Sequence, residues 1–262
     1  MTLSAPLRLA QPRVWIVPAL ALLGSLALLF TGANERVFVL LNGLAPATGD
    51  LLWANVTILG DTVVALSLCL PLARRRPELL WAVVPAALLA SLWVQIYKPL
   101  LDVSRPPEIL GSASIHVIGH AYRYHSFPSG HATTAFALAG LCVLGLRLGV
   151  WSVLPLALAV LTAISRSAVG VHWPLDLLAG ACGGWLAAAL GLKLASRLTF
   201  GLRPMAQWGI ALAFAGCAVA LLAGYDTGYP QALWFQRAIG VVCLAAFALS
   251  FLPARTGRRA PE

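Results

Sequence analysis

Two residues in the second half of this sequence have the types and spacing that nucleophilic chemistry requires. His172 and Asp176 are four residues apart, so a helical turn between them would place both side chains on one face. A carboxylate on one imidazole nitrogen fixes the tautomer and raises the basicity of the other nitrogen. His172 can then act as a nucleophile itself. Taken alone, Asp176 also fits an acidic residue that stabilises the start of a helix.

A second histidine follows a helix-start pattern. His131 comes directly after Pro128, Ser129 and Gly130 and before an apolar run. The free N–H groups of a helix N-terminus bind anions, and a glycine lets a ligand approach the backbone closely. Ser129 adds a hydroxyl donor, and His131 in the first turn would face the bound group. An ordinary capped helix with a histidine at the membrane interface fits the same residues equally well.

Three basic residues accompany these groups, namely Lys98, Arg105 and Arg166. Arginine offers a planar fork and lysine a point charge, a combination suited to a multiply charged anion such as phosphate. Alone, Lys98 is more typical of a lysine that snorkels to a membrane interface. The sequence shows no carboxylate cluster of the kind that Mg²⁺ or Ca²⁺ needs. The three cations also disfavour a transition metal on the two histidines and Asp176.

The composition places these residues in a membrane protein. Of 262 residues, 60% are hydrophobic and only 10% are charged, whereas soluble domains have about 25% charged residues. The apolar runs are continuous rather than alternating, which favours helices over a barrel. The sequence therefore predicts an all-α transmembrane bundle of about eight spans. The spans are expected at 13–31, 50–72, 78–100, 129–147, 150–168, 174–196, 206–224 and 232–252.

The basic residues predict the orientation. The net charge is +9, but no basic stripe with interleaved aromatic residues supports a nucleic-acid partner. With the N-terminus in the cytoplasm and alternating spans, twelve of the 18 Lys and Arg residues are cytoplasmic. These are Arg8, Arg13, Arg74, Arg75, Arg76, Arg147, Lys193, Arg197, Arg203, Arg255, Arg258 and Arg259. Both termini are then cytoplasmic, and the three polar clusters meet at the outer (periplasmic) face. The compact form favours a bacterial inner membrane.

Three motifs in order resemble the signature of a known family. K-x6-R-P starts at Lys98, P-S-G-H at Pro128 and S-R-x5-H-x3-D at Ser165. Together they resemble the type 2 phosphatidic acid phosphatase superfamily, which includes membrane lipid phosphatases, glucose-6-phosphatase and vanadium haloperoxidases. Every signature position matches, over residues 50–196. The resemblance implies a six-helix phosphatase core there, with two additional C-terminal helices at 206–252, in one integral membrane domain (1–262).

The resemblance also implies a role for each motif residue. His172 would attack phosphorus and form a phosphohistidine, Asp176 would orient it, and His131 would protonate the leaving alcohol. The phosphoryl oxygens would be held by Lys98, Arg105, Ser129, Gly130 and Arg166. No metal and no cofactor are expected. In the loop 101–128, Arg123 is the candidate for an extra contact with the substrate headgroup, although most of this loop's polar residues fit a plain surface role better.

The predicted function is a phosphatase acting on a lipid phosphate or pyrophosphate within the bilayer. Candidate substrates are phosphatidic acid, phosphatidylglycerophosphate, undecaprenyl pyrophosphate and lipid A. A phosphotransferase that passes the phosphoryl group to an acceptor hydroxyl is the main alternative. A transporter of phosphorylated compounds fits less well, because it does not explain the histidines and the chain shows no internal repeat. The oligomeric state is left open.

Overall fold

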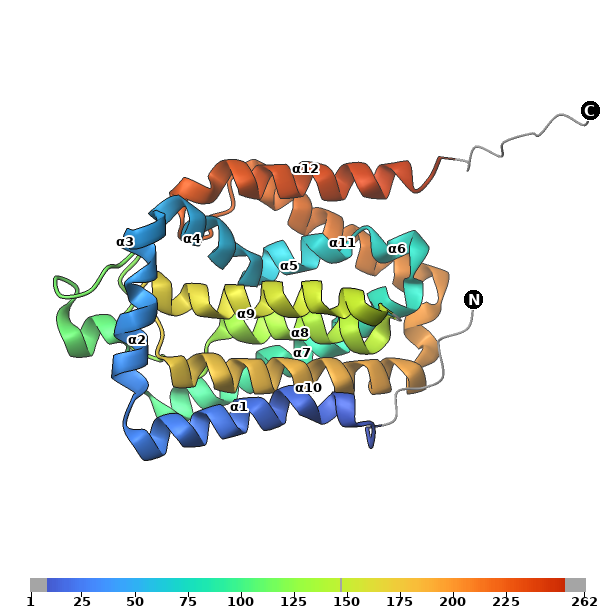
Figure 1. Ribbon diagram of the computed structural model, residues 1–262. Helices are drawn as coiled ribbons and strands as arrows, with labels where there is room; N and C mark the ends of the chain where they lie inside the picture. The colour runs from blue at the N-terminus through green and yellow to red at the C-terminus, as the bar shows by residue number, and fades with distance from the viewer. Residues whose placement is uncertain (1–8, 147, 253–262) are drawn as a thin grey trace, which may run out of the picture.

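The computed structural model describes residues 9–146 and 148–252, and every regular element in these ranges is helical. The long helices lie lengthwise beside one another in one bundle, as Figure 1 shows. The chain is thus an all-α polytopic bundle, as predicted. Arg8, Arg147, Arg255, Arg258 and Arg259, which contributed to the predicted orientation, lie outside the described residues.

Six helical segments of the described chain are long and apolar enough to cross a membrane. They are α1 (Pro12–Thr31), α7 (Pro77–Leu101), η3 with α9 (Gly149–Ser152, Val153–Ala168), α10 (Pro174–Arg197), α11 (Pro204–Ala223) and η5 with α12 (Pro230–Ala232, Leu233–Leu249). A shorter apolar helix, α8 (Gly130–Gly145), occupies the predicted span 129–147. Proline in the first turn starts five of these segments, α1, α7, α10, α11 and η5 with α12, because its missing N–H is unpaired there in any case.

The predicted span 50–72 is the part that differs from expectation. It is divided into α4 (Asp50–Thr57), η1 (Ile58–Gly60) and α5 (Thr62–Cys69), followed by α6 (Leu72–Arg75). At the break, Asp61 has an extended backbone and caps α5 by accepting the N–H groups of Val63 and Val64. A hydropathy window averages over one aspartate in an apolar run, so the sequence pattern missed the break.

Two short helices precede this region and close one end of the bundle. These are α2 (Asn34–Asn42) and α3 (Leu44–Thr48), and the pair Asn34–Thr48 bends by 117° relative to Asp50–Gly60. Buried Asn42 ends α2 and donates to the carbonyls of His116, Ser167 and Ala168, while its Oδ1 accepts the His116 N–H. The loop 101–128 is therefore fastened to the end of α9.

Helix α10 lies against α1, α7 and α8, and small residues bring its backbone close to α8. A Cβ at Gly184 would stand 2.1 Å from the Thr133 carbonyl oxygen, and one at Gly180 would stand 2.7 Å from the Ser129 carbonyl oxygen. Only glycine allows such an approach. The starts of α8 and α10, which carry the second and third motifs, are thereby held side by side.

The two ends of the bundle differ in what they carry. In Figure 1 the start of α1, the short α6 and the end of α12 lie at the right-hand end, while α2 and the loop 101–128 lie at the left. Helices α11 and α12 pack on each other and on α5, and the loop 224–229 between them returns to the left-hand end. The predicted alternation thus brings the three motifs to one end.

Candidate active site

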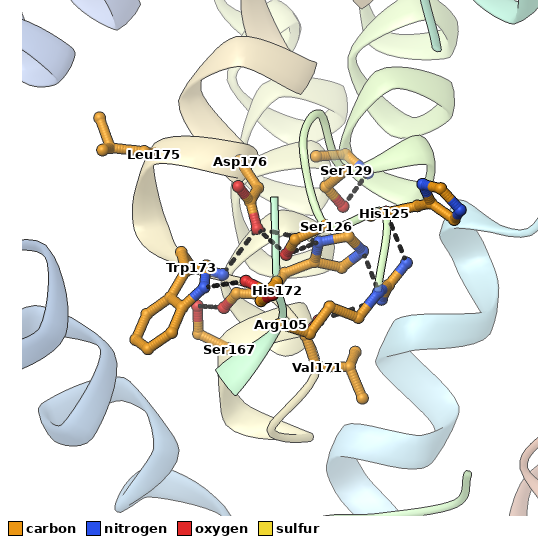
Figure 2. A network of polar contacts seen from close by, with 12 residues as sticks. Arg105, His125, Ser126, Ser129, Ser167, Val171, His172, Trp173, Leu175 and Asp176 are labelled. Carbon is orange, nitrogen blue, oxygen red and sulfur yellow. Dashed lines mark hydrogen bonds and ion pairs between the residues drawn. The ribbon is translucent and has the colours of Figure 1, made fainter. Parts of the chain in front are cut away.

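The paired residues His172 and Asp176 are buried where α9 passes into α10. His172 Nδ1 lies 3.1 Å from Asp176 Oδ2. The same carboxylate oxygen accepts the Trp173 N–H at 2.8 Å and the Ser126 hydroxyl at 2.5 Å, as Figure 2 shows. A carboxylate only accepts, so the contact assigns the imidazole proton to Nδ1. The lone pair of His172 is then on Nε2.

Arg105 lies on the other side of the imidazole (Figure 2). Its Nη1 is 3.2 Å from His172 Nε2 and 3.0 Å from the Val171 carbonyl oxygen. Nε donates to the Tyr124 carbonyl at 2.8 Å, and Nη2 donates to the His125 carbonyl at 3.2 Å. Main-chain oxygens therefore hold the guanidinium in place, directly beside the Nε2 lone pair.

Burial and the surrounding cations keep His172 neutral. Desolvation lowers the pKa of His172 well below its ordinary value, and the charges of Arg105, Arg166 and Lys98 act in the same direction. Burial, followed by repulsion from Arg166, lowers the pKa of Arg105 to about 10, so this guanidinium stays charged near neutral pH. A neutral imidazole among fixed cations can attack a phosphoryl group that the cations hold.

The second motif joins the third through the backbone. Ser129 is buried, its N–H donates to the Asp176 carbonyl oxygen at 3.0 Å, and its hydroxyl accepts the Ala132 N–H at the start of α8. His131 Nε2 is buried, and nothing in the described ranges bonds to it. The backbone of Gly60 presses against this histidine, since a Cβ there would stand 2.8 Å from His131 Cβ. A buried unpaired nitrogen next to a cation cluster is available to a ligand.

Arg166 and Lys98 complete the set of cations. Arg166, in the last turn of α9, is 3% exposed, and its Nη1 donates to the hydroxyls of Thr57 at 2.6 Å and Tyr229 at 2.7 Å. Its Nε has no partner within the described part of the chain. Lys98 is half-buried in the last turn of α7. The structure thus brings all three motifs together.

A family model agrees with this geometry. The model of the PAP2 superfamily matches residues 79–200, which contain all three motifs. The segment 79–200 of this chain belongs to the PAP2 superfamily.

Curated relatives and a solved structure point the same way. The chain is 43% identical over 96 residues to the putative undecaprenyl-diphosphatase YbjG of Escherichia coli K12, covering 31% of this chain and 46% of that protein. It is 43% identical over 63 residues to the undecaprenyl-diphosphatase of Sulfolobus acidocaldarius, covering 24% of this chain and 30% of that one. The chain therefore spans less than half the length of either relative. The crystal structure of Aquifex aeolicus LpxE matches with a TM-score of 0.55 and 27% identity, over 61% of this chain and 94% of that chain.

Arg123 adjoins the PAP2 motif residue Arg105 through its main chain, since its carbonyl oxygen accepts the Arg105 N–H at 2.7 Å. Its side chain is 59% exposed and forms an ion pair with Glu108 at 2.9 Å, and the Tyr124 hydroxyl also donates to Glu108. Another polar residue of this loop, His116, is paired with Asp50 at 2.7 Å and serves as an anchor. A contact of Arg123 with a headgroup stays a prediction, and it would require the Glu108 pair to open.

Three residues that contact the PAP2 motif residues were not predicted from the sequence. Ser126 donates to Asp176, while Thr57 and Tyr229 accept from Arg166. Thr57 and Tyr229 lie outside the family segment 79–200. Ser126 lies in a loop and Thr57 at the end of the short helix α4, and a single serine or threonine at such a place has no periodicity to mark it. Only Tyr229 carried a usable signal, because it belongs to a short polar break between two apolar runs.

Proposed function

We propose that this chain is an integral membrane phosphatase that removes phosphate from a lipid phosphate or pyrophosphate through a phosphohistidine intermediate. The observation that carries the proposal is the neutral His172, whose Nδ1 is bound by Asp176 and whose Nε2 faces Arg105. A phosphoryl group held by the cations would lie next to the nucleophilic nitrogen.

The reaction would proceed in two displacements. His172 Nε2 attacks phosphorus while the bond to the leaving oxygen breaks, and a protonated His131 donates its proton to that oxygen and becomes neutral. Water then attacks the phosphohistidine and gives its proton to His131, which releases inorganic phosphate and restores both histidines. His131 suits this role because its buried Nε2 has no other partner among the described residues.

Positive charge from the protein would stabilise the transition state. Lys98, Arg105 and Arg166 would hold the phosphoryl oxygens, together with the Ser129 hydroxyl and the Gly130 N–H at the start of α8. These groups supply the charge that a divalent metal supplies in many phosphoryl-transfer enzymes. We therefore expect EDTA to change the rate by less than about twofold, while vanadate, which mimics the transition state, inhibits.

A cavity beside His131 supports a lipid as the leaving group. About 230 Å³ of space lies between α5, α7 and α8, from Gly130 and His131 at one end to apolar residues such as Ala137 and Leu141. The leaving oxygen must face His131, so the group attached to it would point into this cavity. The names of the two curated relatives favour undecaprenyl pyrophosphate as the first substrate to test.

The test is phosphate release by the purified protein in detergent. Undecaprenyl pyrophosphate and phosphatidic acid are supplied in turn, and inorganic phosphate is measured for the wild type and for His172→Ala. The variant should lose all release above background, whereas His120→Ala, which changes an exposed histidine of the outer loop, should keep it. Equal release by the wild type and His172→Ala would refute the proposal. Release only with an added acceptor alcohol would identify a phosphotransferase.

We also propose that both termini are cytoplasmic and that the site opens at the periplasmic face of an inner membrane. The support is the charge bias, which includes described residues such as Arg13, Arg74 and Arg197 near the end of the bundle opposite to the motifs. A reporter that fluoresces only in the cytoplasm, fused to the C-terminus, should be bright in cells. A dark reporter with full expression would reverse the orientation.

A further inference from the structure

Arg166 is a buried cation held by neutral groups. Its Nη1 donates to two hydroxyls, Thr57 from α4 and Tyr229 from the connection between α11 and α12. No carboxylate of the described chain lies within ion-pair distance of it. A buried charge is costly without an opposite charge, so Arg166 is ready for an anion.

The Tyr229 side chain is buried and closely packed, although it belongs to the connection between two helices. It is 5% exposed and packs in a small apolar cluster with residues that include Trp53, Ile118 and Val169. Gly119 allows the outer loop to pack directly against Gly228 and Tyr229. A Cβ at Gly119 would stand 2.6 Å from the Gly228 carbonyl oxygen and 3.2 Å from the Tyr229 ring. The ring is thus fixed between α4, the outer loop and the end of α9.

The connection that carries Tyr229 is itself fixed from α12. Buried Gln236 donates to the carbonyls of Leu221 and Tyr225 at 3.1 and 2.8 Å, and its Oε1 accepts the Thr227 hydroxyl at 3.3 Å. Asp226 accepts the Gly228 N–H at 2.7 Å. A buried amide with all these partners defines one conformation for the residues just before Tyr229.

We propose that Tyr229 is a positioning residue of the active site, so that the connection between α11 and α12 takes part in catalysis. The inference rests on the proposed function. By accepting from Nη1 together with Thr57, the Tyr229 hydroxyl holds the guanidinium at one rotation. Nε, which is unpaired in the described structure, is then directed to a phosphoryl oxygen. If Tyr229 served only to pack, its ring would be enough and its hydroxyl would be dispensable.

The experiment compares Tyr229→Phe with Tyr225→Phe, a variant of the same connection whose hydroxyl donates to Asp61 at 3.3 Å instead. Tyr229→Phe keeps the ring and should lower kcat/KM by about tenfold to a hundredfold, since a hydrogen bond to a charged group is lost. Inhibition by vanadate should weaken by a similar factor, and the thermal unfolding midpoint should stay near that of the wild type. Tyr225→Phe should change neither kinetic quantity by more than about twofold.

A double-mutant cycle separates positioning from packing. In an Arg166→Lys background, Tyr229→Phe should have little further effect, because the group that it positions is gone. The same loss in both backgrounds, or full activity and full vanadate sensitivity of Tyr229→Phe, would overturn the proposal. If Tyr229→Phe unfolds, Gly228→Ala replaces it, because φ is +79° at Gly228 and alanine would strain the backbone next to Tyr229 without deleting the ring or its hydroxyl. A wild type that releases no phosphate would instead refute the proposed function.

Discussion

Arg105 and Arg166 bring the same guanidinium group to the site from two regions that hold it differently. Arg105 is fixed by three main-chain carbonyls, those of Val171, Tyr124 and His125. Arg166 is fixed by two side-chain hydroxyls, those of Thr57 and Tyr229. Carbonyls persist whatever side chain stands at a position, whereas hydroxyls are lost by a single substitution. The position of the Arg105 guanidinium therefore does not depend on which side chains its neighbours carry. The position of the Arg166 guanidinium does depend on the side chains around it.

The largest expected effect comes from removing each guanidinium. Arg105→Ala and Arg166→Ala should each lower kcat/KM by about 10²- to 10³-fold, the usual cost of losing one donor to developing charge. Arg105→Ala should also lower the thermal unfolding midpoint, because it leaves three carbonyls without their donor. Phosphate release and thermal unfolding in detergent measure both quantities. If Arg166→Ala kept the wild-type rate, Arg166 would not bind the phosphoryl group.

A smaller effect should follow from the second hydroxyl on Arg166. Thr57→Val keeps the volume of this fully buried side chain but removes the acceptor of Nη1, so kcat/KM should fall by about tenfold. Thr48→Val, which alters a threonine bound to the Trp53 N–H outside the motifs, is the matched control. Equal rates for Thr57→Val and the wild type would show that Tyr229 alone suffices.

The pH dependence of kcat/KM tests how the two cations, Arg105 and Arg166, affect the pKa of His172. Because burial and the cations lower the pKa of His172, its neutral form persists below the ordinary value, and the acid limb of kcat/KM should lie below about pH 6.5. Arg105→Ala should move this limb upward, and by more than Arg166→Ala does, since Arg105 contacts Nε2. A wild-type limb above pH 7 would contradict a neutral His172.

The smallest effect on the rate is expected from changing the side chains of the residues whose main-chain carbonyls bind Arg105. Tyr124→Ala leaves the carbonyl that accepts from Arg105 Nε, and it removes only an exposed ring and a 3.4 Å contact with Glu108. The rate should stay within about threefold of the wild type. A loss as large as that of Tyr229→Phe would erase the distinction between the two regions.

The sequence predicted the features that follow from helical periodicity and from the order of the helices along the chain. The i, i+4 spacing of His172 and Asp176 corresponds to a contact in the structure, and helix alternation brought the start of α8 and the end of α9 to the same end of the bundle. Contacts between remote, irregular segments could not be predicted, because they depend on how loops fold back. Tyr229 lies 63 positions from Arg166 and Ser126 lies 50 positions from Asp176, and neither pair leaves a pattern in the chain.

The contact between Tyr229 and Arg166 also bears on where this chain can be truncated. A truncation after Leu202 would keep every motif residue and the whole family segment, yet it would take away one of the two hydroxyls on Arg166 and uncover α5. The boundary of the matched segment is therefore not the boundary of a transferable unit. A chimera built from this chain should carry residues 204–249 along with the motifs.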